Sequence, residues 1–513
     1  MNQTLDDLME RLRHHTRLGH AARDAAFLRQ VALAVTSGGT SLAKAAGASA
    51  SPLANLVSLY RFLDNADIPV SAMRQARARF VLERIPRGSP VLVVHDLTQL
   101  NYSRHPSKTD RRLIGDHREE GYEYTACALI DPASGAFLGL VHDTLLTAHG
   151  PDDQETIDYG LDPLFADFSE EEKQRLRANH RHQMVAHIHG LSPLLAHHQP
   201  IDVADREFDD IFILDRCLQN RRHFVIRSSA LRNVQVPQAD WIPPRARTRK
   251  QAGHPLEKGW LVVHLKRLVE AIPLRPYKAL PLDADNRVVD ASAAVRTAHL
   301  GIGTCRVRLY RPAKRNKRYF LPPRIVEVNL VVIRELTPPA HTAPLLWVLF
   351  TSLPVDTTDQ LFYIGHLYEL RWKIEEFFKL LKSGYRIEAV RLDSAPKIAK
   401  LLVLLSLAAM TLLTLKTQLG LPAGGRLSDA DYRRVKSALS QLDNPQIPLN
   451  LRLFAFIART GGWLARRNDP IGPTLLMRGA LQFFATLDAL TRYGPLLNEV
   501  LQSSPCSRRQ KRV

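Results

Sequence analysis

Cysteine is scarce in this sequence. The chain has four cysteines in 513 residues, and none of them stands in a CxxC pair; they are Cys127, Cys217, Cys305 and Cys506. Disulfide-stapled domains and zinc ribbons need closely spaced cysteines, so the pattern excludes a disulfide framework and argues against a structural zinc site. We therefore expect a protein of the reducing cytoplasm.

Long apolar runs are also missing. The longest, at 401–415, is interrupted by Ser406 and two threonines and enclosed by Lys400 and Lys416. A membrane-spanning helix needs about 20 apolar residues, so we expect a buried helix here. The N-terminal stretch MNQTLDDLMERLRHH lacks the basic-then-apolar order of a signal peptide. Together these features predict a soluble, cytoplasmic protein.

Acidic residues are in deficit. The chain has 51 Asp plus Glu against 70 Lys plus Arg, which gives a formal net charge of +19 and a pI near 9.9. Such an excess on an enzyme-sized chain predicts a polyanionic partner, either nucleic acid or an anionic membrane surface. The charge is spread along the chain, which favours a long nucleic-acid track over a single basic tail.

Histidine is frequent, but no HExxH motif occurs. We expect one helix over 169–197, opened by a capping box of Ser169 and Glu172. Its histidines are His180, His182, His187 and His189, with His197 and His198 at its end. Side chains two residues apart on a helix diverge by about 200°. We therefore expect titrating surface histidines here, not metal ligands.

Residues 361–392 carry the most informative pattern. Treated as one helix, the segment places four polar residues within an arc of about 60°; they are Tyr368, Arg371, Glu375 and Lys382. A carboxylate can hold Mg²⁺, and cations beside it can hold phosphates. The alternative is a solvated helix face with ion pairs four residues apart.

Two upstream acids stand at the ends of predicted strands. A five-residue apolar strand ends at Asp96, and two strands around a turn follow at 122–146. A short strand from residue 201 ends at Asp205, in the sequence DREFDD, and a helix and another strand follow it. The ends of strands are where α/β folds place their sites. Asp205 could instead only cap the helix after it.

These motifs resemble those of a known family. The helix pattern matches, position for position, the Y-(2)-R-(3)-E-(6)-K signature of bacterial cut-and-paste transposases of the insertion-sequence-four family. DREFDD resembles that family's D-R-E-x-D motif, and 60–68 and 453–484 resemble its N-terminal and C-terminal segments. The resemblance extends over about residues 17–490. It implies that Asp96, Asp205 and Glu375 form a DDE catalytic triad.

The order of elements and the resemblance imply an α/β ribonuclease-H-like catalytic core, interrupted by a mostly β insertion and flanked by all-helical N-terminal and C-terminal domains. The expected ranges are 1–72 for a helical DNA-binding domain, 73–229 and 344–397 for the two parts of the core, 230–343 for the insertion, and 398–513 for a helical dimerisation domain with a basic tail. In the insertion, strands are expected at 304–310 and 325–334, and basic runs lie at 245–250 and 311–318. In the last range, helices are expected near 428–442, 450–466 and 474–492. Within the first range, 2–36 reads as one helix. Residues 41–65 read as a short helix, a turn at Gly47 and a second helix that begins near Pro52. This pattern fits either a helix-turn-helix reader or an ordinary helical hairpin.

The expected chemistry depends on metal ions. Three neighbouring carboxylates repel each other unless they share a cation. Two Mg²⁺ ions, for which Mn²⁺ could substitute, would neutralise this repulsion. Asp96, Asp205 and Glu375 are the expected ligands. The ions would activate water or a DNA 3′-hydroxyl and stabilise the leaving oxygen. The resemblance implies nicking, hairpin formation and strand transfer by a homodimer assembled on double-stranded DNA, at inverted repeats and at target DNA.

The resemblance also assigns DNA-binding residues. Tyr368, Arg371 and Lys382 would clamp phosphates, and Trp347 would stack a flipped base in a pocket that Trp372 also lines. A buried core position is the alternative for Trp347. His95, beside Asp96, is expected only to line the site. Two other functions stay open: a DNA-binding regulator or relic that no longer cuts, and a sequence-tolerant nuclease on the same fold.

Overall fold

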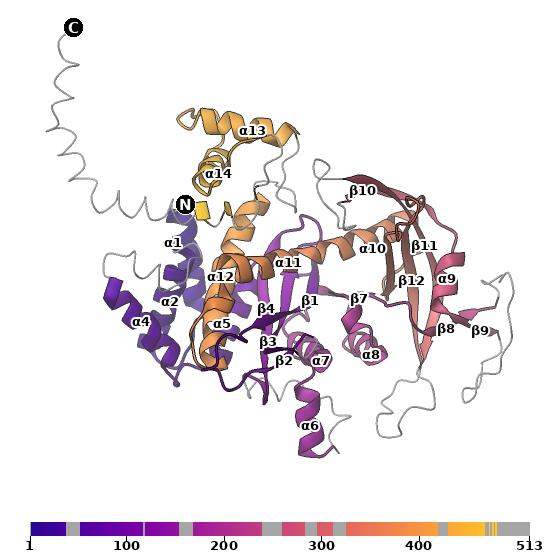
Figure 1. The fold of residues 1–513 in the computed structure, drawn as a ribbon, viewed down its shortest axis with the longest axis horizontal. Coiled ribbons are helices and arrows are strands. Elements are labelled where there is room, and N and C mark those ends of the chain that lie inside the picture. Colours follow the sequence, from indigo (N-terminus) through magenta and orange to yellow (C-terminus); the bar gives the residue numbers. More distant parts are fainter. Residues whose placement is uncertain are drawn as a thin grey trace, which may run out of the picture.

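The computed structural model describes residues 2–36, 52–115, 118–152, 168–238, 259–282, 295–310, 325–418 and 429–466, and positions 471, 475, 476, 478 and 479. Within these ranges, thirteen strands form one sheet in the order β5-β4-β3-β1-β6-β7-β13-β12-β11-β8-β9, with β2 beside β3 and β10 beside β11. Helices cover both faces of the sheet (Figure 1).

The strands are β1 Pro90–Asn101, β2 Arg112–Ile114, β3 Glu119–Ile130, β4 Phe137–Thr147, β5 Gly150–Pro151, β6 Gln199–Ala204, β7 His223–Arg227, β8 Asn233–Pro237, β9 Trp260–His264, β10 Arg275–Leu282, β11 Arg296–Tyr310, β12 Ile325–Glu335 and β13 Leu346–Thr351. The α-helices are α1 Asn2–His15, α2 Ala21–Thr36, α4 Pro52–Asp64, α5 Val70–Glu83, α6 Glu170–Arg177, α7 His180–Leu191, α8 Ile211–Gln219, α9 Leu265–Ala271, α10 Thr358–Leu370, α11 Trp372–Lys379, α12 Ala395–Gln418, α13 Asp429–Ser440 and α14 Leu449–Thr460. Three short helices complete the set, η3 Arg206–Phe208, η6 Leu380–Gly384 and η7 Ile387–Ala389.

The first half of the sheet has the expected ribonuclease-H-like arrangement. β1, β3 and β4 are antiparallel neighbours, and β6 and β7 follow on the other side of β1 as parallel strands. This mixed sheet is consistent with a DDE-type core. The expected extent of the first strand was wrong, because β1 continues to Asn101 and Asp96 lies within it. Pairing with β3 on one side keeps the backbone extended beyond the apolar run.

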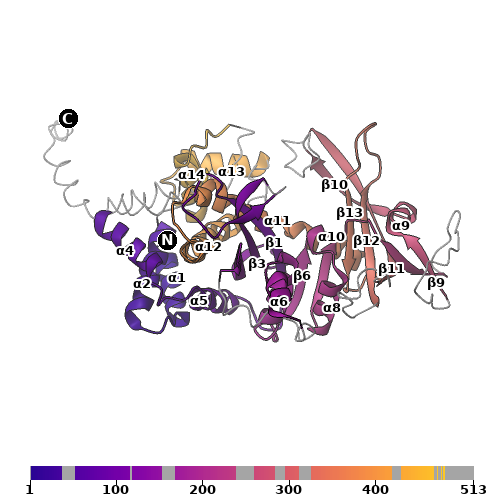
Figure 2. The same cartoon turned by 60° about the horizontal axis from the view of Figure 1, so that its bottom comes forward.

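The two faces of the sheet bury separate cores. In β7, Val225 belongs to the core under α5, α10, α11 and α12, whereas Phe224 and Ile226 belong to the core under α7, α8 and α9. We call these the α11 face and the α7 face. The alternation follows from the two-residue repeat of a strand. Both views of the fold show helices on the two sides of the central strands (Figures 1 and 2).

The N-terminal helices differ from the prediction in two ways. The expected helix over 2–36 is two helices, because the chain turns between α1 and α2 at Gly19, whose φ is +85°. The expected domain boundary at residue 72 falls inside α5, which packs against β4 and α12 of the core. The expected helix from Pro52 is confirmed as α4, whereas the turn at Gly47 lies outside the described residues.

The segment 230–343 is mostly β where it is described, as expected. Its strands do not form a separate sheet, because β12 pairs with β13 and continues the core sheet outward to β9. Both basic runs of this segment, at 245–250 and 311–318, lie outside the described residues. Likewise, the helix expected over 169–197 is two helices, α6 and α7, joined at the N-cap Asn179.

The C-terminal helices begin with the apolar run. α12 is longer than that run, and by length and composition its Ala395–Thr414 window could cross a membrane, but 78% of the window is buried inside the protein. It packs against α2, α5 and β4, as expected of a core helix. α13 and α14 confirm two expected helices and share their own apolar cluster. The helix expected over 474–492 lies largely outside the described residues.

The segment 361–392 is not one regular helix. α10 and α11 meet at Arg371, where the Arg371 N–H donates to Tyr368 O and the Ile374 N–H donates to Arg371 O, each only three residues back. After α11 the chain forms a π-helical turn, η6, which contains Lys382. A π turn changes the angular phase of the residues that follow it. The uniform helical wheel therefore misplaces Lys382.

Candidate active site

Asp96 and Asp205 come from neighbouring parallel strands. His95 of β1 lies opposite Ala204, the last residue of β6, so Asp96 within β1 and Asp205 directly after β6 are both one residue beyond this pair. The side chain of Asp96 contacts Arg371 on the α11 face. The Asp205 carboxylate also accepts a hydrogen bond of 2.8 Å from the Glu207 N–H and caps η3. Capping holds this side chain beside Asp96, so the two interpretations of Asp205 are compatible.

Arg371 connects the first and third acids. One guanidinium nitrogen lies 2.6 Å from Asp96 Oδ2, and the other lies 2.7 Å from Glu375 Oε1. Burial raises the pKa of Asp96 to about 7, Arg371 opposes the rise, and the nearby carboxylates of Asp205 and Glu375 add to it. The acids thus act on one another electrostatically. The fold brings the three predicted acids into one site.

This site suits a hard divalent cation. Its donors are carboxylate oxygens, the ligands that Mg²⁺ and Mn²⁺ prefer. The pKa of Asp96 is raised mainly by burial, and the carboxylates of Asp205 and Glu375 add to the rise, so a cation bound among the three acids would favour the ionised form of Asp96. Asp96, Asp205 and Glu375 are the residues that could hold such an ion.

Tyr368 and Trp347 lie next to the acids but inside the core. The Tyr368 side chain is 1% exposed and Trp347 is 5% exposed, and their rings meet edge to face with centroids 5.4 Å apart. The structure therefore places Trp347 in the buried position that was the alternative for it. Trp372 is 40% exposed, and the Arg371 guanidinium lies 5.5 Å from the centre of its ring.

Lys382 faces a different group. Its Nζ lies 3.9 Å from Glu388 Oε1, and burial lowers its pKa. Of the four signature residues, Arg371 and Glu375 meet the acids, Tyr368 packs against Trp347, and Lys382 lies beside Glu388. This division follows from the irregular turns at Arg371 and η6, which the helical wheel does not represent.

The buried hydroxyl of Tyr368 gives a testable prediction. It has no hydrogen-bond partner among the described residues. Tyr368→Phe should therefore change the free energy of unfolding by less than about 1 kcal/mol, measured by urea denaturation. Tyr102→Phe is the matched control, because the Tyr102 hydroxyl donates to Ile387 O at 2.7 Å. The free energy of unfolding of Tyr102→Phe should be lower than that of the wild type by about 1–3 kcal/mol. Equal losses in the two variants would contradict the prediction.

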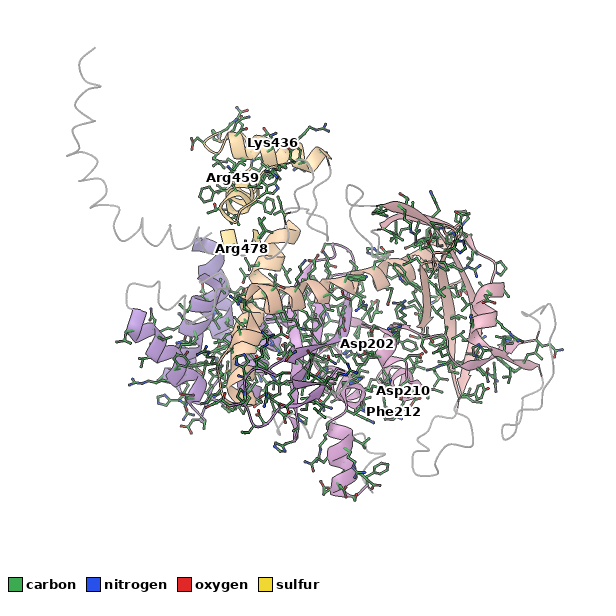
Figure 3. The ribbon with its side chains drawn as sticks, in the orientation of Figure 1. Asp202, Asp210, Phe212, Lys436, Arg459 and Arg478 are labelled. Carbon is green, nitrogen blue, oxygen red and sulfur yellow. The ribbon has the colours of Figure 1, made fainter. Side chains whose placement is uncertain are left out.

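A buried ionic group that was not predicted lies behind the site. Asp202 accepts hydrogen bonds of 2.6 and 2.5 Å from Arg222 and lies 2.7 Å from His95 Nε2. Figure 3 labels Asp202 near the middle of the molecule, beneath the long helix formed by α10 and α11. His95 therefore points to the α7 face and does not line the acidic site. The signal was present, since an acid within the apolar strand 201–204 requires a buried partner.

The expected surface histidines also need correction. His187 is 2% exposed and packs against His142, with ring centroids 4.2 Å apart and the ring planes tilted by 35°. Burial lowers the pKa of His187 well below its ordinary value. His187 is therefore a neutral core residue. The helix periodicity could not reveal this, because the face that α7 presents to the sheet depends on the break between α6 and α7.

Residues 172–412 match the family model described as the transposase DDE domain. The matched range includes Asp205 and Glu375, and Asp96 precedes it. The match supports a DDE transposase, a class that cleaves and joins DNA phosphodiesters and typically uses divalent metal ions.

Proposed function

With this match as the premise, we propose that the protein is a cut-and-paste transposase of the insertion-sequence-four type. It binds the terminal inverted repeats of an insertion sequence and catalyses Mg²⁺-dependent nicking, hairpin formation and strand transfer. The observation that supports the proposal is that Arg371 contacts both Asp96 and Glu375, and that Asp205 lies close enough to raise the pKa of Asp96. It acts in the cytoplasm, on the nucleoid.

The acids and Arg371 have distinct roles in this proposal. Asp96, Asp205 and Glu375 hold the Mg²⁺ ions, for which Mn²⁺ can substitute, and the bound ions activate the attacking oxygen and stabilise the leaving one. Arg371 offers two nitrogens on one planar fork, which suits a phosphate as well as it suits two carboxylates. When DNA enters, Arg371 exchanges a carboxylate for a phosphate and orients the scissile bond.

Aromatic side chains beside Arg371 would receive a flipped base. Trp372 is accessible in the DNA-free chain and can stack a base at once. Trp347 can do so only after Tyr368 moves, because its ring is covered in this structure. Tyr368 and Lys382 then turn towards the DNA backbone. We retain all four as proposed DNA-binding residues, together with Arg371.

The helical parts at both ends would assemble the complex. The N-terminal helices would read the repeat, and the region from 398 onward would join two subunits on DNA. The separate apolar cluster of α13 and α14 supports a distinct C-terminal unit. Figure 3 labels three cations on this unit, Lys436, Arg459 and Arg478. They could contact DNA that passes between subunits.

A gel assay tests the proposal. Labelled duplexes carrying the inverted repeat that flanks this gene are incubated with the full chain, with and without Mg²⁺, and separated on a denaturing gel. The proposal expects Mg²⁺-dependent nicks and a hairpin-sized product at the repeat boundary. A shifted but uncut duplex would favour the DNA-binding regulator. Equal cutting of a scrambled repeat would favour the sequence-tolerant nuclease.

The raised pKa of Asp96 predicts a pH-dependent metal requirement. With its pKa at about 7, Asp96 is mostly protonated at pH 6 and mostly ionised at pH 8. A proton and a cation compete for the carboxylate, so the affinity for Mg²⁺ falls as the pH falls. The half-saturating Mg²⁺ concentration for cleavage should rise about tenfold from pH 8 to pH 6. A requirement that does not change with pH would contradict this prediction.

A further inference from the structure

Four side chains on the α7 face form a compact buried group. His95, Cys127 and His142 lie opposite one another on β1, β3 and β4, so they project from the same face of the sheet. His187 of α7 covers them. Ligand atoms of His95, Cys127 and His187 all lie within 4.8 Å of one another. These three residues are at most 2% exposed.

His95 is oriented as a metal ligand would be. Its Nε2 is bonded to Asp202, which Arg222 holds with two hydrogen bonds. Its other nitrogen, Nδ1, is buried and has no hydrogen-bond partner among the described residues. In the tautomer whose Nε2–H donates a hydrogen bond to Asp202, Nδ1 carries no proton and keeps a lone pair for a metal ion. A carboxylate that holds an imidazole in this way is a common support for a metal-ligating histidine.

We propose that His95, Cys127 and His187 bind a thiophilic divalent cation of the zinc class. Two imidazole nitrogens and one sulfur form a soft donor set, which favours Zn²⁺ or Co²⁺ over Mg²⁺. With bond lengths of about 2.0–2.3 Å, tetrahedral ligands lie roughly 3.3–3.7 Å apart, so no pair of ligand atoms, all within 4.8 Å of one another, needs to approach by more than about 1.5 Å. His142 is the candidate fourth ligand, because its buried Nδ1 lacks a partner within the described part of the chain.

Binding releases one proton. The thiol S–H bond of Cys127 breaks as the sulfur–metal bond forms, and the proton leaves to solvent. The neutral histidines donate lone pairs without losing a proton. The ligands come from three strands and a helix, so no sequence spacing could indicate them. A metal bound here would contradict the expectation, drawn from cysteine spacing alone, that the chain has no structural zinc.

A cation bound by the histidine and cysteine group would influence the acidic site through β1. His95 and Asp96 are consecutive residues that project to opposite faces of the sheet. A cation bound to His95 would fix the part of β1 that carries Asp96. Cation binding itself does not depend on the proposed transposase function, so the two proposals can fail separately.

Cobalt spectroscopy tests the proposal. Co²⁺ is titrated into the metal-stripped full-length protein while the near-ultraviolet thiolate-to-cobalt band and the visible bands are recorded. We expect saturation at one equivalent, retention of the thiolate band in Cys305→Ser, and its loss in Cys127→Ser. Cys305 is the matched control, because it is a half-buried cysteine on β11, outside the group. No thiolate band in the wild type, or an unchanged band in Cys127→Ser, overturns the proposal.

A second measurement covers the case in which Cys127→Ser does not fold. The melting temperature of the wild-type protein is measured with Zn²⁺, with Mg²⁺ at the same concentration, and with chelator. Binding to the folded chain alone stabilises it. We expect Zn²⁺ to raise the melting temperature by a few degrees, and His187→Gln to reduce that rise at least twofold. A Zn²⁺ effect no larger than that of Mg²⁺, or one unchanged in His187→Gln, overturns the proposal.

Discussion

Glu375→Ala is expected to lower Mg²⁺-dependent cleavage more than about 100-fold while the protein still shifts the repeat duplex. Loss of a residue that only supports a metal ligand costs about 10- to 100-fold, and Glu375 is proposed as a ligand itself. It lies on α11 within reach of Arg371, which also contacts Asp96. Removing it leaves two acids to hold the ions. The denaturing gel measures cleavage, and a native gel measures binding.

The neighbouring carboxylate provides the control. Glu376 is on the same helix, but the side-chain hydrogen bonds described for Arg371 go to Asp96 and Glu375. Glu376→Ala should therefore retain cleavage within a few-fold of the wild type. If Glu375→Ala cuts as well as Glu376→Ala, the acidic site is not the catalytic centre. If Glu375→Ala fails to bind, its loss of cleavage says nothing about catalysis, and Glu375→Gln, which keeps the shape, takes its place.

Arg222→Met is expected to lower the free energy of unfolding by about 3–5 kcal/mol, because it leaves the charge of Asp202 buried without its cation. Arg222 and Asp202 are at most 2% exposed and share two hydrogen bonds of 2.5 and 2.6 Å. Met keeps most of the apolar volume of the side chain, so the loss reports mainly the charge. Urea denaturation at pH 7 measures it.

The loss of stability in Arg222→Met should become smaller as the pH falls. Burial raises the pKa of Asp202, but Arg222 and His95 overcome burial and hold it at about 2, below the ordinary 3.8. The stabilisation from this depressed pKa is present above about pH 4 and is lost as the pH falls through 2. Without Arg222 the carboxyl of Asp202 takes up a proton at a higher pH. The difference in free energy of unfolding between the wild type and Arg222→Met should therefore decrease from pH 7 to pH 4.

An exposed ion pair is the control for this variant. Arg175 pairs with Glu171 on α6, and both side chains are more than 70% exposed. Arg175→Met should leave the unfolding transition essentially unchanged, since solvent already screens that pair. A similar loss in both variants would mean that the substituted side chain, and not the buried charge, causes the effect.

Much of the candidate site could be predicted because its residues follow local patterns. Apolar runs predicted the strands that carry Asp96 and Asp205, and the alternation of the later segment predicted β11 and β12. The Ser169 capping box was also correct, because a cap depends on residues three positions apart. Arg371 and Glu375 were correctly placed on one side of a helix, since they are separated by a single turn.

Errors arose where an outcome depends on distant partners. The helical wheel misplaced Lys382, because a π turn after α11 changes the phase. His95 was expected to line the acidic site, but its side chain contacts Asp202 and His187 on the other face of the sheet. Surface histidines were expected on the helix over 169–197, but His187 is buried against His142 of β4. Each error concerns a residue whose position depends on how its own helix or strand packs against others.

The sequence by itself determined which chemistry is available: carboxylates at the strands and the helix, a large positive charge, and the segments that become α or β. Hydrophobic periodicity and capping are local, so the order of residues carries them. Only the tertiary structure decided which side chains meet. The parallel register of β1 and β6 places Asp96 and Asp205 side by side, and the same register sends His95 to the opposite face. Because a strand alternates its faces at every residue, the packing of the whole sheet separates the acidic site from the histidine and cysteine group behind it.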